Sequence, residues 1–166
     1  LYPSERDANM AKSNYPLGIV IDNGSKFNNT VSMVGRGQNS GGAAYVFEPA
    51  DEYKGDFART YFYVVTAYQN LTWKYTYMAQ NGNYPTLQPW AIELLLNWHR
   101  QDPVSEKEVL RNEAVYKIQN NRNPYIDHPE LAEYIWGNKK GQVFNDTSDP
   151  SSGTPTLISP VQGMVL

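Results

Sequence analysis

The sequence reads Pro-Trp-Ala-Ile-Glu-Leu-Leu-Leu-Asn-Trp-His-Arg-Gln-Asp-Pro-Val-Ser-Glu-Lys-Glu over residues 89–108, and this stretch decides the fold. Pro89 suits the first position of a helix, because its missing N–H would have no partner there. Apolar residues then recur every three to four positions, which predicts a helix with one buried face. Asp102-Pro103 ends this helix. Ser105 and Glu108 have the spacing of a capping box, so a second helix is expected to begin there and run to about Gln119.

Three further helices are expected on either side of this stretch. Helical spacing of apolar residues begins near Asp56. A short helix is predicted over residues 4–12, with Ser4 as its N-cap. The last helix is expected to start from an Asp127 cap and to end at Gly137, a residue suited to a left-handed stop.

Strand signals are few. Two short strand-like pieces occur at residues 17–21 and 43–47, and the Gly-, Ser- and Asn-rich stretch between them indicates an irregular loop. The predicted fold class is therefore α+β and predominantly helical. Residues 138–166 are rich in Gly, Asp, Ser and Pro, which predicts a linker and the start of a following β-rich module, with residues 1–137 as the main domain.

The composition limits what the protein can be. The chain has 166 residues, 40% hydrophobic and 19% charged, which suits one folded domain and excludes a disordered chain. No apolar run approaches the roughly 18 residues that span a bilayer, so membrane insertion is not expected. Cysteine is absent, which excludes disulfides and thiolate metal sites. A net charge of −3 argues against a stable DNA-binding protein, but less against an enzyme with only a local basic track.

Three blocks carry a family resemblance. Leu1 to Gly18 ends in Asn-Tyr-Pro-Leu-Gly, and Lys54 to Tyr63 reads Lys-Gly-Asp-Phe-Ala-Arg-Thr-Tyr-Phe-Tyr. Leu94 to Pro129 contains Trp-His-Arg-Gln-Asp-Pro-Val-Ser-Glu-Lys-Glu and, later, Gln-Asn-Asn-Arg-Asn-Pro-Tyr-Ile-Asp-His-Pro. Together these blocks resemble the endonuclease I family, a branch of the His-Me finger (ββα-metal) nucleases, and most strongly its secreted members from Bacteroidetes-like bacteria.

The resemblance implies a partial ββα-metal fold and a metal-dependent endonuclease. Such an enzyme hydrolyses phosphodiester bonds of DNA, with RNA as a second substrate, and shows low sequence specificity. It uses one divalent cation, typically Mg²⁺, with Ca²⁺ and Mn²⁺ as alternatives, and a histidine that activates water. A secreted or periplasmic protein that acts as a monomer is expected.

The resemblance also assigns residues. Asn9 matches the metal-binding asparagine of the ββα helix, and Arg6 and Lys12 on the same helix match phosphate contacts. Arg122 is a further candidate for nucleic-acid binding, because arginine binds phosphate with two parallel hydrogen bonds. The general-base histidine is expected tens of residues before Leu1, so the chain by itself is expected to be inactive.

Several of these residues have a structural alternative. Asn9 may be read instead as a solvent-facing helical amide, since most helical asparagines are. His99 with Asp102 is the one His-Asp pair that offers a general base and its orienting group. The favoured interpretation of His99 is a histidine stabilised by the negative end of the helix dipole and packed under Trp98. Arg111, Asn112 and the pair Arg122-Asn123 are interpreted mainly as a polar network that fixes the loop Asn120–Asp127.

The 13 tyrosines and 4 tryptophans leave a second function open. Helical spacing places four of them in the core: Tyr61, Trp90, Trp98 and Tyr134. The candidate exposed aromatic surface is the group in residues 68–84: Tyr68, Trp73, Tyr75, Tyr77 and Tyr84. An exposed aromatic group of this kind binds bases or sugars. The alternative function is therefore a non-catalytic glycan- or ligand-binding module of a secreted multidomain protein.

Overall fold

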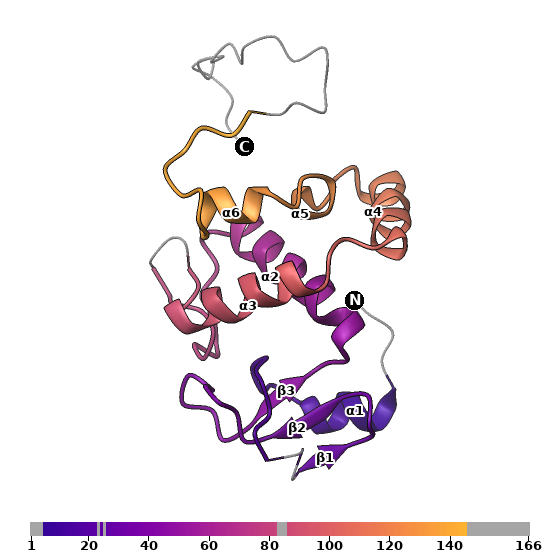
Figure 1. The fold of residues 1–166 in the computed structure, drawn as a ribbon, viewed down its shortest axis with the longest axis vertical. Coiled ribbons are helices and arrows are strands. Elements are labelled where there is room, and N and C mark those ends of the chain that lie inside the picture. Colours follow the sequence, from indigo (N-terminus) through magenta and orange to yellow (C-terminus); the bar gives the residue numbers. More distant parts are fainter. Residues whose placement is uncertain (1–4, 23, 25, 83–85, 146–166) are drawn as a thin grey trace.

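The computed structural model describes residues 5–22, 24, 26–82 and 86–145. A small sheet with one short helix forms one end of the molecule, and five helices form the rest (Figure 1). In chain order the elements are α1 (Arg6–Lys12), β1 (Phe27–Asn28), β2 (Met33–Gly35), β3 (Val46–Glu48), η1 (Asp51–Tyr53), α2 (Lys54–Ala67), α3 (Pro89–Gln101), α4 (Glu106–Gln119), α5 (Pro124–Asp127) and α6 (Leu131–Ile135). The mixed and mostly helical class is confirmed.

The sheet is antiparallel, with the strand order β1-β2-β3 and Val34 paired with Phe47. Residues 17–21 do not form a regular strand. They extend the sheet by single bridges, in which Leu17 pairs with Phe47 and Val20 with Gly37. The prediction of an irregular loop after this segment was wrong, because β1 and β2 lie in it.

The shortness of the strands and a glycine within one of them explain why the sequence did not predict the sheet. Strands of two or three residues are too short to show alternation of apolar and polar residues. Gly35, in β2, lies so close to Asp22 that a Cβ atom there would meet the Asp22 carboxylate. The same carboxylate accepts a hydrogen bond from the Arg36 amide at 3.0 Å. The glycine that suggests a loop in the sequence therefore allows two segments to pack closely.

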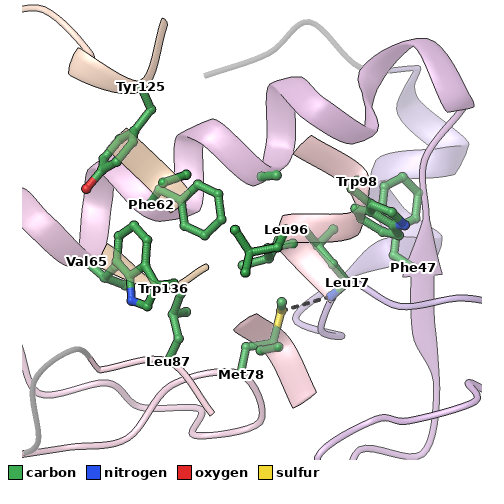
Figure 2. Close-up of a cluster of buried hydrophobic side chains, with 14 of the residues drawn as sticks. Leu17, Phe47, Phe62, Val65, Met78, Leu87, Leu96, Trp98, Tyr125 and Trp136 are labelled. Atoms are coloured by element: carbon green, nitrogen blue, oxygen red, sulfur yellow. Dashed lines mark hydrogen bonds between the residues drawn. The ribbon is translucent and has the colours of Figure 1, made fainter. Parts of the chain in front are cut away.

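The core forms where α2 and α3 pack against each other (Figure 1). Around Phe62 of α2, aromatic rings come together from the C-terminal helices (Figure 2). The Phe62 and Trp136 rings stack at 4.6 Å between centroids, and the Tyr125 ring lies 5.6 Å from each of them. The Leu17 amide contacts the Met78 sulfur at 3.3 Å, which links the segment after α1 to the residues before α3.

The helix boundaries predicted for residues 89–119 are confirmed. Pro89 begins α3 and Asp102 is its C-cap. At the start of α4, the Glu108 amide donates to the Ser105 hydroxyl at 3.4 Å and the Ser105 amide donates to the Glu108 carboxylate at 3.2 Å. Helix α4 ends at Gln119, and Asn120 follows in the left-handed conformation.

Two predicted N-caps were wrong. The first residue of α1 is Arg6, and its N-cap is Glu5, whose carboxylate accepts from two amides of the first turn. Ser4 lies outside the described residues. Asp127 ends α5 and does not cap α6, because its carboxylate is bound by Arg122 at 2.7 Å and 2.8 Å.

Gly137 is not the left-handed stop that was predicted. Helix α6 ends at Ile135 with Trp136 as its C-cap, and Gly137 is not among the residues with positive φ. A Cβ atom on Gly137 would meet the Glu133 carboxylate. That carboxylate accepts a hydrogen bond from the Asn138 amide at 3.0 Å. Glycine is needed here for close approach and not for an unusual backbone conformation.

The division of the chain at residue 137 stays a prediction. Phe144 still contacts the body of the domain, since its ring lies 5.3 Å from that of Tyr134 and 5.9 Å from that of His128. Residues 146–166, which hold most of the predicted linker and module, lie outside the described residues. None of the described helices is long and apolar enough to cross a membrane.

Candidate functional site

Helix α1 presents two of the predicted site residues to solvent. Ala8 is buried against the body of the domain, whereas Arg6 and Asn9 are exposed. Glu5 fixes the start of this helix, because its carboxylate accepts from the amides of Asp7 and Ala8, both at 3.3 Å. The helix is therefore anchored by one face and leaves the amide of Asn9 accessible.

The Asn9 side chain makes no hydrogen bond to any other described residue; only its backbone groups do so, with Glu5 and Ser13. Its amide oxygen is a neutral, hard ligand of the type that binds Mg²⁺. Within the part of the chain that the structure describes, no group of three or more His, Asp or Glu residues could hold a metal. Mg²⁺ commonly keeps several waters and takes few protein ligands, a coordination that a single asparagine side chain can join.

Lys12 lies at the other end of α1 and is half-buried. Its ammonium lies 5.9 Å from the centroid of the Phe47 ring. Among residues 5–22, 24, 26–82 and 86–145, no carboxylate lies within salt-bridge distance of it. Burial lowers the pKa of Lys12, since the charged form loses hydration. An anion beside this ammonium would offset that cost.

A cavity of about 340 Å³ opens beside Lys12. One wall is formed by the residues from the end of α1 to Pro16, and the facing wall by residues 73–79. Lys74 and Tyr75 lie on this facing wall, and Tyr61 of α2 is also part of the lining. Among the residues that the structure describes, no aspartate or glutamate lines the cavity.

The aromatic group predicted from the sequence belongs largely to this cavity. Tyr75 is 42% exposed and lines it together with Trp73 and Tyr77. Tyr68 is 51% exposed but does not line it. Tyr84 lies outside the described residues. The exposed aromatic surface is therefore joined to a lysine of α1.

His99 is buried, and both of its ring nitrogens have partners. Its Nε2 lies 2.9 Å from the Pro129 carbonyl oxygen, and its Nδ1 lies 3.4 Å from Nη1 of Arg59. Its ring meets that of Phe62 edge-on at 6.0 Å. Burial and the adjacent Arg59 charge lower the pKa of His99, so the neutral ring that donates from Nε2 fits both contacts. The idea that the helix dipole stabilises a charged His99 is therefore not supported.

Asp102 does not orient His99. Its carboxylate accepts from the Gly55 amide at 2.8 Å, and its backbone oxygen accepts from Arg59 at 2.8 Å. A Cβ atom on Gly55 would meet that backbone oxygen, so glycine is required for the close approach of α2 to the end of α3. These contacts support a scaffold role for the His99–Asp102 region.

A buried charge cluster joins α2 to α4, and the sequence reasoning missed it. Arg59 is fully buried, and its guanidinium binds both carboxylate oxygens of Glu108 at 2.7 Å and 2.6 Å. Asp56, also buried, lies 3.7 Å from Arg59 and 3.0 Å from the Lys107 ammonium. The available signal was an arginine one turn before Phe62 and beside Ala58, on the face of α2 that the structure buries, where an unpaired charge would be too costly.

Arg122 is also held by carboxylates. It binds Asp127 with two hydrogen bonds and Glu113 with one at 2.6 Å. The predicted polar network is confirmed, because the Asn112 amide group bonds the backbone of Asn123 in both directions, at 2.9 Å and 3.3 Å, and also reaches Asp127 at 3.1 Å. Contact of Arg122 with phosphate stays a prediction.

The structure separates the predicted site residues into two groups. Arg6, Asn9 and Lys12 share one helix, and Lys12 at its end lines the cavity. Arg122 lies between α4 and α5, at the end of the molecule opposite α1 (Figure 1). Only the first group forms a continuous candidate site.

Part of this chain is similar to two known extracellular ribonucleases. Over 95 residues, the chain is 43% identical to an extracellular ribonuclease of Bacillus amyloliquefaciens. Over 103 residues, it is 40% identical to an extracellular ribonuclease of Bacillus subtilis (strain 168). Each match covers 54% of this chain and 32% of the relative, so the chain spans about a third of the length of these curated relatives. Residues 1–130 match the family Endonuclease I. Because that match covers most of the chain, this protein belongs to the Endonuclease I family.

Proposed function

We propose that the complete protein is a secreted, metal-dependent nuclease that hydrolyses phosphodiester bonds with low sequence specificity. The observation that carries the proposal is the exposed amide of Asn9, whose side chain has no hydrogen-bond partner among the described residues, on a helix that also bears Arg6 and Lys12. Membership of the Endonuclease I family supports hydrolysis of nucleic acids. The names of the two Bacillus relatives favour RNA as a substrate beside DNA, and an extracellular location.

Asn9 is the residue of this chain that would hold the cation through its amide oxygen. Bound Mg²⁺ supplies charge neutralisation at the phosphate and at the leaving oxygen. A neutral amide suits this role because the site must also accept an anionic phosphate. Ca²⁺ and Mn²⁺ are alternative ions, since both also take oxygen ligands.

Arg6 and Lys12 would bind the substrate backbone. They lie one turn before and one turn after Asn9, at spacings of three residues that place side chains on neighbouring turns of a helix. Lys12 has no carboxylate partner among the described residues that a phosphate would have to displace. These two side chains would therefore position the phosphate close to the amide of Asn9.

The general base is proposed to come from outside this chain, as a histidine upstream of Leu1. Within the chain, His99 is buried and held by Pro129 and Arg59, and His128 packs against Phe144. Neither arrangement leaves an imidazole nitrogen beside Asn9. The chain by itself is therefore expected to bind nucleic acid without cleaving it.

The test compares the complete protein with its Asn9→Ala variant on plasmid DNA and on ribosomal RNA. With Mg²⁺ the wild-type protein should cleave at least one of these substrates, and chelator should stop the reaction. Asn9→Ala should lower the rate by about 10²-fold or more, in line with the loss of one preorganised electrostatic contact. Asn97→Ala, at another exposed helical asparagine, is the matched control and should keep the wild-type rate.

Two results would overturn parts of this proposal. A complete, folded protein that cleaves neither DNA nor RNA in any of the three metals would reject the nuclease function. Wild-type turnover by Asn9→Ala would reject the metal assignment and leave the nuclease function standing.

A further inference from the structure

The cavity beside Lys12 has a positively charged lining, which favours anionic ligands. Lys12 and Lys74 line it, and none of the described carboxylates does. Burial raises the pKa of Tyr61 to about 12, so the hydroxyl in its wall stays neutral at physiological pH. A third ammonium contacts the lining, because Lys26 donates to the hydroxyl of Tyr15, a lining residue, at 2.7 Å. A hollow lined by one sign of charge concentrates ligands of the opposite sign.

The same cavity has a rigid aromatic wall. The rings of Tyr75 and Tyr77 stack at 5.9 Å with 16° between their planes. The Tyr75 hydroxyl accepts a hydrogen bond from Asn14 at 3.3 Å, which ties this wall to the residues after α1. Asn81 bonds the amide and the carbonyl of Trp73 at 2.7 Å and 3.1 Å, so the backbone of this segment is held as well. Aromatic rings fixed before binding lose little conformational entropy when a planar ligand stacks on them.

We propose that this cavity binds one nucleotide of an unpaired nucleic-acid strand. The base contacts the aromatic wall of Tyr75 and Tyr77, and the adjoining phosphate lies between Lys12 and Lys74. The inference rests on the proposed nuclease function and deepens it, because it names single-stranded nucleic acid, or a locally opened duplex, as the preferred substrate class.

The chemistry of the lining distinguishes this ligand from two others. A base inside an intact duplex has both faces stacked on its neighbours, so it cannot use an aromatic wall. A neutral glycan can accept hydrogen bonds from the two lysines but lacks the charge attraction that a phosphate would gain from them. A cavity of about 340 Å³ lies at the lower end of the roughly 300–1,000 Å³ found for small-ligand sites, which suits one nucleotide.

The position of the cavity connects it to the proposed site of cleavage. Lys12 follows Asn9 by three residues, so their side chains lie on neighbouring turns of α1. A phosphate at Lys12 would therefore be followed along the strand by a phosphate near Asn9. The cavity would hold the strand in place while the neighbouring bond is cleaved.

The test measures binding of this 166-residue chain to a fluorescein-labelled single-stranded 12-mer by fluorescence anisotropy, with EDTA present so that no strand is cleaved. Tyr75→Ala should weaken binding about 5- to 100-fold, the range expected for the loss of one base-stacking contact, and Tyr75→Phe should restore it. Lys12→Gln should weaken binding and make the slope of log K against log salt concentration shallower by about 0.7. Tyr116→Ala and Lys140→Gln are matched controls outside the cavity and should bind as wild type; Tyr116 is 43% exposed and Tyr75 42%.

Other ligands, measured in place of the single strand, give the results that would overturn the inference. A matched duplex, or a strand with abasic sites throughout, should bind at least about 5-fold more weakly than the single strand. Equal binding of either would reject base stacking in the cavity. Salt-independent binding, or competition by a neutral oligosaccharide, would identify a glycan site instead. Unchanged binding by a folded Tyr75→Ala variant would also reject the inference.

Failure of this inference is distinguishable from failure of the proposed function. Binding is measured without metal and on a chain that is not expected to cleave. A complete protein that cleaves duplex and single strands equally, with wild-type binding by Tyr75→Ala, keeps the nuclease function and loses the cavity. A protein that binds single strands through Tyr75 but never cleaves keeps the cavity and loses the nuclease function.

Discussion

Arg59 places a full positive charge in the interior of the domain. The Glu108 carboxylate accepts from two of its nitrogens, and the Asp102 carbonyl from a third. Burial of the pair removes both ions from water, so the attraction between them mainly offsets the cost of their desolvation. The pair contributes little as a net gain in stability, but the loss of one partner leaves the other charged and unpaired.

Arg59→Met should therefore lower the free energy of unfolding by about 3–5 kcal/mol, as expected when a buried pair loses one ion. Arg59→Lys should not restore stability, because lysine cannot form the paired hydrogen bonds of a guanidinium. Lys117→Met is the control, since the Lys117–Glu113 pair is exposed on both sides, with side chains 71% and 46% exposed, and its loss should cost far less. Urea unfolding followed by tryptophan fluorescence measures all three. Equal losses for Arg59→Met and Lys117→Met would contradict the importance of burial.

His99 gives a pH prediction at the same scale. Its pKa is lowered in the folded protein by burial and by Arg59, so the unfolded chain binds the proton more readily. The stabilisation is fully present above about pH 6.5 and is lost as the pH falls below that value. His99→Gln should remove this part of the pH dependence. Free energies of unfolding of both proteins between pH 7.5 and 5 measure it, and parallel profiles would show that His99 does not contribute.

At the scale of elements, the capping box of α4 combines two roles. Glu108 bonds the Ser105 amide and also neutralises Arg59, so the start of α4 is tied to the middle of α2. Ser105→Ala removes one of the box's two hydrogen bonds and leaves the ion pair in place. It should cost about 1 kcal/mol of unfolding free energy, the usual effect of losing an N-cap.

Ser105→Asp, which restores an acceptor at the cap, is the matched variant for this measurement. Its stability should return close to that of the wild type. A loss as large for Ser105→Asp as for Ser105→Ala would show that the side-chain acceptor is not what stabilises the start of α4.

The sequence predicted those elements whose signals are local. Pro89 and the Ser105–Glu108 pair determine helix ends within a few residues, and both predictions are confirmed. The strands β1 and β2 were missed because strands of two and three residues are too short to show a repeating pattern of their own, although they pair with each other as neighbours in the sequence. Asp127 and Gly137 were misassigned because side-chain contacts with near neighbours, Arg122 and Glu133, use these residues for other purposes.

The candidate site, too, was predicted only in part from the sequence. Asn9 came from the family resemblance, and its exposure agrees with that assignment. The cavity was not predicted from the sequence, because Lys12 and Tyr75 are separated by more than sixty residues and no local pattern indicates that they meet. Several residues in the family-specific blocks, among them Arg59, His99 and Asp102, form the scaffold. The resemblance was thus carried mainly by the framework and only in part by the proposed site.

At the scale of the whole molecule, the C-terminal helices are attached by polar as well as aromatic contacts. Glu133 of α6 binds Arg100 of α3 at 2.7 Å and 2.9 Å, and also accepts from the Asn138 amide. The Arg100 guanidinium is the main cause that lowers the pKa of Glu133 to about 2. A carboxyl with a lowered pKa stabilises the folded protein above its ordinary pKa, and this contribution is lost as the pH falls through the folded value.

The domain should therefore lose stability between about pH 4.5 and pH 2 by protonation of Glu133. Glu133→Gln should be less stable than the wild type at pH 6, and the difference should shrink toward pH 2. Thermal unfolding across this range, monitored by circular dichroism, measures the effect. A difference that stays constant with pH would mean that the charge of Glu133 is not what stabilises the attachment of α6.

The cavity is built from two parts of the chain that are made at different times. Asn14 and Tyr75, which tie its walls together, are separated by 61 residues, as are Leu17 and Met78 beneath it. On the ribosome, α1 emerges early, when the segment it needs has not yet been synthesised. Closing such a long loop also carries an entropic cost before any contact forms. Helix α1 therefore cannot pack against this segment until it has been synthesised. The cavity, and the strand binding proposed for it, can form only after the chain has passed residue 79.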